Sequence, residues 1–198
     1  MNTQQPKILG VMGSGVRSYP ELARTVGRIA ANLGYHLLTG GGGGVMEEAS
    51  RAFCETSPRR GLCLGILKGK THPHPEKGLP RLVYSSSPAN DWVEIPIYTH
   101  LPLSGSQGRD EASRNHINVL SSDVLVALPG GSGTYSEVTL RIDYGRRLIL
   151  FLGGHKIHGH SAEHFVSMAQ YRAQVTIAGT SEELEQLLRQ QLEESALA

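Results

Sequence analysis

The chain has 198 residues, a length typical of one domain with a sizeable hydrophobic core. A net charge of +1 gives no broad basic surface, so we expect no nucleic-acid partner. No apolar run approaches the roughly 18 residues of a membrane span, and no signal peptide opens the chain. The only two cysteines, Cys54 and Cys63, indicate reduced thiols. These features predict a cytoplasmic protein with no membrane partner.

Apolar runs alternate with helical patterns along the chain. Strands are predicted at residues 7–12, 36–39, 62–67, 124–128, 148–152 and 174–177. Helices are predicted at residues 20–33, 45–55, 109–120, 134–144, 162–172 and 181–194. Such alternation favours a parallel sheet with helices on both of its faces. The sequence therefore predicts an α/β fold with a Rossmann-like, doubly wound, mostly parallel sheet, in a single domain over residues 1–198.

A long proline-rich segment, residues 68–108, interrupts this alternation and is predicted to be irregular. A connection of this length in a compact domain is usually functional or contains a short strand. Residues 95–98 (Ile-Pro-Ile-Tyr) are the candidate strand. Because a proline cannot donate to a neighbouring strand, we expect this strand at an edge of the sheet.

Three glycine-rich turns each follow a predicted strand. The residues expected to contact a ligand there are Gly13, Ser14, Gly15, Gly40, Gly41, Gly42, Gly43, Gly130, Gly131, Ser132, Gly133 and Thr134. Turns that follow parallel strands gather at the carboxyl edge of the sheet, where such folds bind ligands. Glycine lets the backbone approach a phosphate closely, and a helix N-terminus attracts the anion. The turns match neither the Walker motif nor the dinucleotide motif, so we expect a phosphate-bearing ligand and no NAD.

Glu137 lies three residues after Thr134, near the start of the helix that follows the third turn. A carboxylate beside a phosphate cradle suggests a contact with a sugar hydroxyl or with a reacting carbon. The alternative is a capping box, because Thr134 and Glu137 have the spacing of that motif, with Thr134 as the N-cap. Both roles can coexist.

The helix predicted at residues 109–120 carries further polar side chains toward the same edge. Arg109 or Arg114 could hold a phosphate with two hydrogen bonds, or could form a surface ion pair with Asp110 or Glu111. Asn115 and Asn118 could bond the edge of a heterocycle or could cap the backbone locally. We count Arg114, Asn118 and Glu137 among the predicted ligand-binding residues.

Four histidines crowd one short segment: His155, His158, His160 and His164. Their spacing suits a transition metal, with His155, His158 and His160 as candidate ligands. Protonated imidazoles would instead suit an oxyanion such as molybdate or tungstate. The third interpretation is a polar surface loop that binds nothing.

The combination of residues 40–47, Arg114 and residues 129–137 resembles the "lonely guy" phosphoribohydrolases, a superfamily often mislabelled as lysine decarboxylases. Residues 129–137 contain the signature P-G-G-x-G-T-x-x-E in full. The resemblance implies a Rossmann-like fold, a dimer or larger oligomer, and hydrolysis of the N-glycosidic bond of a nucleoside 5′-monophosphate. It also implies that Arg114 and Glu137 are the catalytic pair. Asn115 departs from the lysine that the hydrolases usually have there.

Residues 8–13, 93–101 and 114–127 are similar to the molybdenum cofactor carrier proteins, which share this fold. Those proteins bind a phosphorylated pterin dithiolene that holds molybdenum, and the resemblance implies protection and transfer of that cofactor. We favour this function over hydrolysis. None of the lysines stands in a recognisable pyridoxal phosphate setting, so that cofactor is not expected. Apolar helical faces beyond those needed for the core predict a homodimer or homotetramer.

Overall fold

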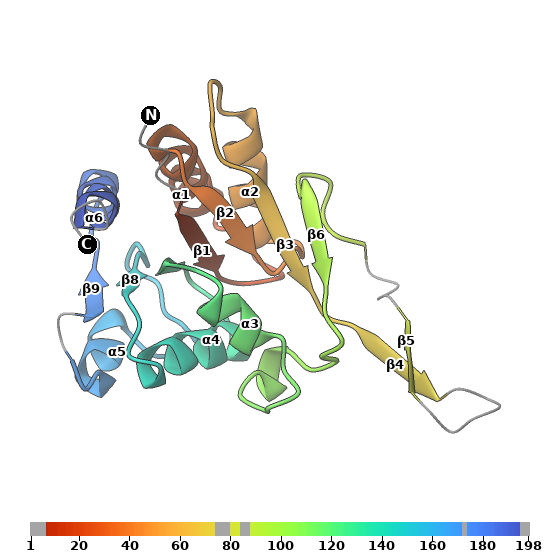
Figure 1. Ribbon diagram of the computed structural model, residues 1–198. Helices are drawn as coiled ribbons and strands as arrows, with labels where there is room; N and C mark the ends of the chain where they lie inside the picture. Colours follow the sequence, from red (N-terminus) through yellow and green to blue (C-terminus); the bar gives the residue numbers. More distant parts are fainter. Residues whose placement is uncertain (1–6, 74–79, 84–87, 172–173, 195–198) are drawn as a thin grey trace.

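The computed structural model describes residues 7–73, 80–83, 88–171 and 174–194. Seven parallel strands form one sheet in the order β6-β3-β2-β1-β7-β8-β9 (Figure 1). These strands are β1 (Ile8–Met12), β2 (His36–Thr39), β3 (Cys63–Leu67), β6 (Ile95–Tyr98), β7 (Val124–Ala127), β8 (Leu148–Leu150) and β9 (Val175–Ile177). The predicted Rossmann-like α/β fold is confirmed.

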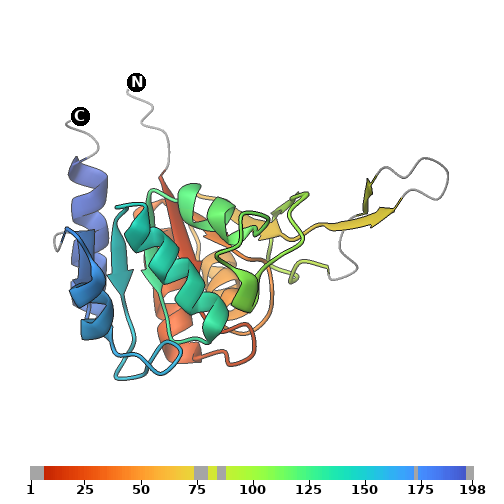
Figure 2. The same cartoon turned by 90° about the horizontal axis from the view of Figure 1, so that it is seen from below.

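Helices cover both faces of the sheet. They are α1 (Pro20–Leu33), α2 (Val45–Glu55), α3 (Asn115–Leu120), α4 (Ser132–Asp143), α5 (Ala162–Met168) and α6 (Ser181–Glu194), with a 3-10 turn η1 (Gly105–Gln107). In Figure 2, α1 and α2 lie on one side of the strands and α3 and α4 on the other. Among the described residues, no helix is long and apolar enough to cross a membrane.

Alternating residues of the central strands supply two hydrophobic cores. On β7, Val124 and Val126 pack with α1, α2 and α6, whereas Leu125 and Ala127 pack with residues of α4 and α5. Successive side chains of a strand point to opposite faces, so a strand covered by helices on both sides must be apolar throughout. This explains why the predicted strands appear in the sequence as continuous apolar runs.

The strand order places a switch point between β1 and β7. The chain runs outward from β1 through β2 and β3 to β6, and then returns to β7 on the other side of β1. Loops that follow strands on the two sides of such a point diverge, leaving a crevice at the carboxyl edge of the sheet. The turns after β1, β2 and β7 are the three glycine-rich turns.

The segment predicted to be irregular contains regular structure. Strand β6 coincides with the candidate at residues 95–98 and lies at the edge of the sheet, as predicted. Two further strands were not predicted: β4 (Lys70–Pro73) and β5 (Pro80–Val83) form an antiparallel hairpin that projects from the body of the protein (Figures 1 and 2).

The helix predicted at residues 109–120 is half as long in the structure, because α3 begins only at Asn115. The Asp110 carboxylate accepts a hydrogen bond from the Ala112 backbone N–H (2.9 Å), and Leu103 exchanges backbone hydrogen bonds with Ala112 and Arg114. These bonds satisfy backbone groups that a helix would otherwise use. Helix α5 also ends early, at Met168.

Candidate functional site

The three glycine-rich turns meet at the carboxyl edge of the sheet. The Ser14 N–H donates to the Pro129 carbonyl (3.0 Å), and the Val45 N–H donates to the Ser14 carbonyl (2.9 Å). A Cβ added to Gly130 would lie only 2.1 Å from Oγ1 of Thr134, so no larger residue fits there. The first turn is therefore held between the other two by backbone hydrogen bonds.

A cavity of about 340 Å³ opens where the turns meet. It is lined by Gly13, Ser14, Gly15, Val16, Met46, Ser104, Gly105, Arg114, Asn115, Gly131, Ser132, Gly133, Thr134 and Glu137. Most of the predicted ligand-binding residues are in this set. The exceptions, which do not line the cavity, are Gly40, Gly41, Gly42, Gly43, Asn118 and Gly130.

The N-terminus of α4 faces this cavity. The helix begins at Ser132, with Gly131 as its N-cap and no side-chain hydrogen bond at the cap. Thr134 is therefore not the N-cap, and the predicted capping box with Glu137 is wrong. In the described part of the chain, no protein group accepts from the N–H groups of residues 132–134. Free N–H groups at the positive end of a helix dipole form a ready site for an anion.

Glu137 is 8% exposed and lies on the second turn of α4. Its Oε1 accepts a hydrogen bond from Nδ2 of Asn118 (3.1 Å). Burial raises the pKa of this carboxyl above its ordinary value, although the charge of Arg114 and the Asn118 hydrogen bond oppose the shift. Asn118 is fully buried and positions Glu137, rather than lining the cavity as predicted.

Arg114 reaches across from the start of α3 to the end of β3. Its Nη1 donates to the carbonyl of Ile66. Burial lowers the pKa of the guanidinium, and the charge of Glu137 opposes that shift. Arg109 has a different place: it donates to Oγ1 of Thr139 (2.8 Å) and pairs with Asp143 (2.5 Å), outside the cavity. Arg109 therefore forms an ion pair, but its partner is Asp143 on α4 and not Asp110 or Glu111 as predicted.

Several site residues were not predicted. Val16 is 93% exposed, and together with Met46 it gives the cavity an apolar wall. Asn90, which lies in the proline-rich segment, holds the second glycine turn by donating from its N–H to the Gly41 carbonyl (2.8 Å) and from Nδ2 to the Gly42 carbonyl (2.9 Å). No local signal in the sequence connects Asn90 to a turn about fifty residues earlier.

Comparison with known proteins assigns the chain to a family. The model of the SLOG cluster4 family matches residues 6–186. The chain belongs to the SLOG cluster4 family. An uncharacterized protein of Archaeoglobus fulgidus is 32% identical over 143 residues, which are 71% of this chain and 76% of that protein.

Two solved structures extend the similarity to nearly the whole chain of this SLOG cluster4 protein. The molybdenum cofactor binding protein from the phototrophic bacterium Rippkaea orientalis is 32% identical, with a TM-score of 0.68 over 94% of this chain and 98% of that one. The molybdenum cofactor carrier protein of Chlamydomonas reinhardtii is 29% identical, with a TM-score of 0.71 over 96% and 99% of the two chains. The predicted kinship with the molybdenum cofactor carriers is confirmed.

The histidine segment of this SLOG cluster4 protein lies beside the third glycine turn. The His158 N–H donates to the Gly130 carbonyl (2.8 Å), and His160 stacks on His164 with ring centroids 4.1 Å apart. His155 instead contacts Tyr19. Within the described ranges, no three His, Cys, Asp or Glu side chains gather as a metal site would require. Oxyanion binding by His155, His158 and His160 stays a prediction.

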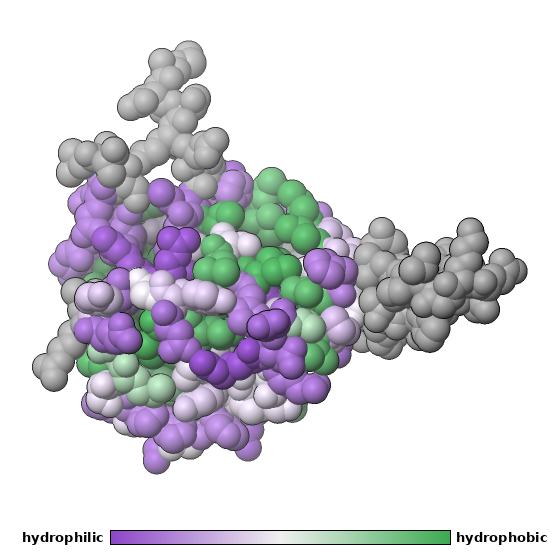
Figure 3. All heavy atoms as spheres, turned by 60° about the horizontal axis from the view of Figure 1, so that its bottom comes forward, coloured by the Kyte–Doolittle hydropathy of each residue, from purple (hydrophilic) through white to green (hydrophobic). Residues whose placement is uncertain are grey.

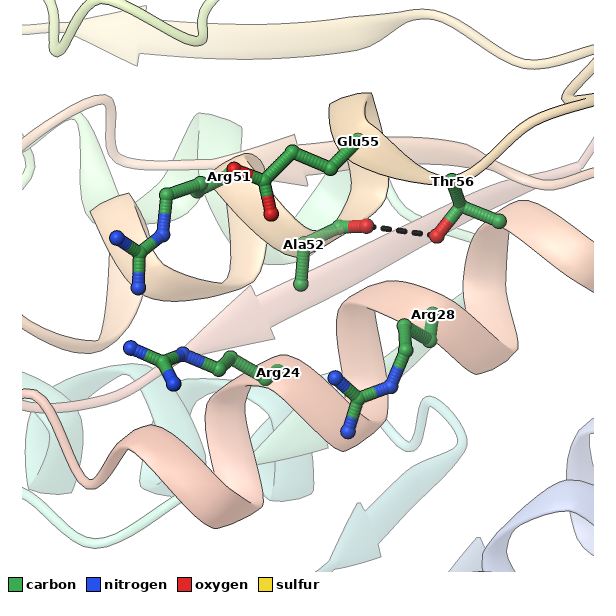
Figure 4. Close-up of a pocket in the computed structure, with 6 residues that line it drawn as sticks. All are labelled: Arg24, Arg28, Arg51, Ala52, Glu55 and Thr56. Carbon is green, nitrogen blue, oxygen red and sulfur yellow. Dashed lines mark hydrogen bonds between the residues drawn. The ribbon is translucent and has the colours of Figure 1, made fainter.

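A second hollow, of about 410 Å³, lies between α1 and α2 and shares no lining residue with the cavity (Figure 4). Arg24, Arg28 and Arg51 point toward it. Arg24 and Arg51 both donate to Oε2 of Glu48 (2.7 Å each). Arg24 and Arg51 therefore have a structural role, because the carboxylate that they share connects α1 to α2.

Proposed function

We propose that this chain binds and carries a phosphate-bearing small molecule, and that this molecule is the molybdenum cofactor. The observation that carries the proposal is the cavity in which an open helix N-terminus and the half-buried Arg114 converge. Two similar structures, which cover nearly all of this chain, are named for binding or carrying the molybdenum cofactor. Hydrolysis of an N-glycosidic bond is the alternative function, and the raised pKa of Glu137 favours it.

The residues of the cavity fit such a ligand in three places. The free N–H groups of residues 132–134 would hold the terminal phosphate, and Arg114 would add a positive charge. Val16 and Met46 offer an apolar surface for the flat pterin ring, and a thioether packs well against such a ring. A volume of about 340 Å³ falls within the usual range for ligand pockets.

The test follows the decay of released cofactor in air, with and without the protein. We expect the half-life to lengthen with the wild type. Arg114→Met keeps much of the side-chain volume and removes the charge, so it should lose most of this protection. Arg28→Met, at an exposed position outside the cavity, is the matched control. An unchanged half-life with the wild type would refute the carrier proposal.

One observation favours hydrolysis as the second candidate. Burial raises the pKa of Glu137, and a carboxylic acid that keeps its proton closer to neutral pH suits general acid catalysis on a leaving base. Arg114 would then hold the phosphate or orient the ribose. The test is incubation with a panel of nucleoside 5′-monophosphates, with release of free base as the readout. A lack of turnover on every one of them would remove this candidate.

Glu137→Gln separates the two functions. The amide has the shape of the protonated carboxyl but cannot transfer a proton. If the chain is a hydrolase, the substitution should abolish release of base and leave binding nearly intact. If it is a carrier, protection of the cofactor should change little.

A further inference from the structure

Two hydrogen-bond donors at the cavity have no acceptor among the described residues: Nδ2 of Asn115 and Nε of Arg114. Both atoms are buried, and Asn115 as a whole is only 2% exposed. Both residues line the cavity. A buried donor without a partner is costly, and such groups in a native structure call for an explanation.

The fold offers no replacement for the missing acceptors. The backbone N–H of Asn115 already donates to Oγ of Ser113 (3.1 Å), which fixes the start of α3. Nδ2 of Asn115 lies against Gly108, where an added Cβ would come within 2.2 Å of it. The same point is 2.7 Å from Cβ of Ser136 and 2.8 Å from the Gly105 carbonyl oxygen, so the amide is packed among residues 105, 108 and 136 at the wall of the cavity. None of these groups is a hydrogen-bond acceptor for Nδ2, and a ligand that enters the cavity beside Asn115 could supply one.

The groups around Asn115 favour acceptors over donors on the ligand. Arg114 can only donate. Oε1 of Glu137 already accepts a hydrogen bond from Asn118, and burial raises the pKa of this carboxyl, which disfavours its charged form. Arg114 and Asn115 therefore present donors at the cavity, where Met46 lies beside the Arg114 guanidinium.

The structure assigns Asn115 as a specificity residue, whose side-chain amide donates a hydrogen bond to a ring carbonyl oxygen of a phosphorylated heterocycle. This rests on the proposed function, because the phosphate at the N-terminus of α4 is what brings the ring to Asn115. The 4-oxo pyrimidine ring of a pterin has such a carbonyl. So do the six-membered rings of hypoxanthine and guanine, whereas adenine has an amino group in that place.

Inosine and adenosine 5′-monophosphates are suitable probes, because an oxo group in one replaces an amino group in the other. Ribose 5-phosphate reports on the phosphate site without any ring. We expect inosine monophosphate to bind wild-type protein about three- to tenfold more tightly than adenosine monophosphate, the range of one net hydrogen bond. Binding is measured by calorimetry, and free base is assayed in the same samples so that turnover is recognised.

Two variants test the role of Asn115 itself. Asn115→Leu should remove the preference for the oxo ring, and Asn115→Asp should reverse it, because a carboxylate accepts from an amino group. Asn32→Asp, on the exposed side of α1, is the control for the added charge. Equal binding of the two nucleotides by wild type, or a preference that survives both substitutions, overturns the assignment. If ribose 5-phosphate fails to bind the wild type, the proposed function fails and the assignment with it.

Discussion

The guanidinium of Arg114 lies directly against the backbone of Gly40. A Cβ added to Gly40 would be 2.7 Å from Nη1 and 2.8 Å from Nη2 of Arg114. Gly40 does not line the cavity, yet its missing side chain is what allows Arg114 to reach the Ile66 carbonyl at the end of β3. A glycine predicted to touch the ligand thus acts through an arginine that does line the cavity.

Gly40→Ala should displace Arg114 and weaken anion binding. The added methyl group overlaps the guanidinium, and overpacking of a buried site typically costs about 1–3 kcal/mol of unfolding free energy. Gly131→Ala is the steric control, because a Cβ there would meet no atom within 4 Å. Chemical denaturation of both variants measures the difference. A loss of stability as large for Gly131→Ala as for Gly40→Ala would contradict this account.

Glu137 should make the stability of the ligand-free protein depend on pH. Its pKa is raised in the folded state, so the folded protein binds a proton more tightly than the unfolded chain does. The stabilisation is present below the unfolded pKa near 4.5 and is lost as the pH rises through the folded pKa. In that window the wild type loses stability by as much as about 1.4 kcal/mol per pH unit.

Glu137→Gln cannot ionise and should escape this loss. We expect its unfolding free energy, relative to wild type, to increase from pH 4.5 toward pH 8. Denaturation midpoints measured across that range give the comparison. Parallel pH profiles for the two proteins would show that burial of Glu137 does not control its ionisation.

The glycine turns and most strands could be predicted because their signals are local. Five consecutive glycines after a short apolar run identify the turn at residues 40–44, and Pro96 marks β6 as an edge strand. The remaining site residues depend on tertiary contacts. Val16 has ordinary surroundings in the sequence, and only the fold brings it beside Met46 at the cavity.

The prediction of a helix over residues 109–120 was wrong in its first half because side chains there bond to the backbone. Its apolar spacing is helical, but Asp110 and Ser113 use their side chains to bond the backbone N–H groups two residues ahead. Leu120, one of the apolar positions in this spacing, is 42% exposed in the structure. Periodicity alone does not reveal such competition between side chain and backbone.

Arg141 is fully buried and should be essential for folding stability. It donates to the carbonyls of Val119, Ser122 (3.0 Å), Asp123 (2.8 Å) and Arg147 (2.9 Å), connecting α4 to the segment between α3 and β7. Burial lowers its pKa to about 10, which still leaves it charged at neutral pH.

Arg141→Met would remove the hydrogen bond that Arg141 donates to each of these four carbonyls. We expect a loss of about 3 kcal/mol or more of unfolding free energy. Arg146→Met, at an exposed position nearby, should change stability by less than about 0.5 kcal/mol. Urea denaturation of both variants is the measurement, and similar effects of the two substitutions would contradict the role of Arg141.

The two cysteines should react at different rates in the folded protein. The Cys54 thiol is half-buried and donates to the Trp92 carbonyl (3.2 Å), and its hydrogen bond with Cys63 lowers its pKa. That same contact, together with burial, raises the pKa of Cys63. The thiolate is the reactive form, so iodoacetamide should label Cys54 first. Mass spectrometry identifies the site, and equal labelling of Cys63 would argue against this order.

Strand β6 leaves an apolar surface at the edge of the sheet that a second copy of the chain should cover. Ile95 and Ile97 are both 41% exposed. Because Ile97 is in register with Ile66, it extends the face of the sheet that Ile66 occupies inside the core. Figure 3 shows groups of apolar residues, drawn in green, among hydrophilic ones on the face that it presents. Contiguous apolar surface of this kind commonly marks a protein interface.

The chain is therefore expected to sediment as a homodimer or homotetramer at micromolar concentration, and Ile97→Asp should shift it toward the monomer. A buried carboxylate opposite an apolar partner surface would be desolvated without a counterion, which disfavours association. Ile177→Asp is the matched control, because Ile177 is 40% exposed on β9 at the opposite edge of the sheet. Analytical ultracentrifugation of the wild type, Ile97→Asp and Ile177→Asp measures the oligomeric state of each. A monomeric wild type would end the oligomer prediction, and dissociation caused by Ile177→Asp alone would move the interface to the β9 edge.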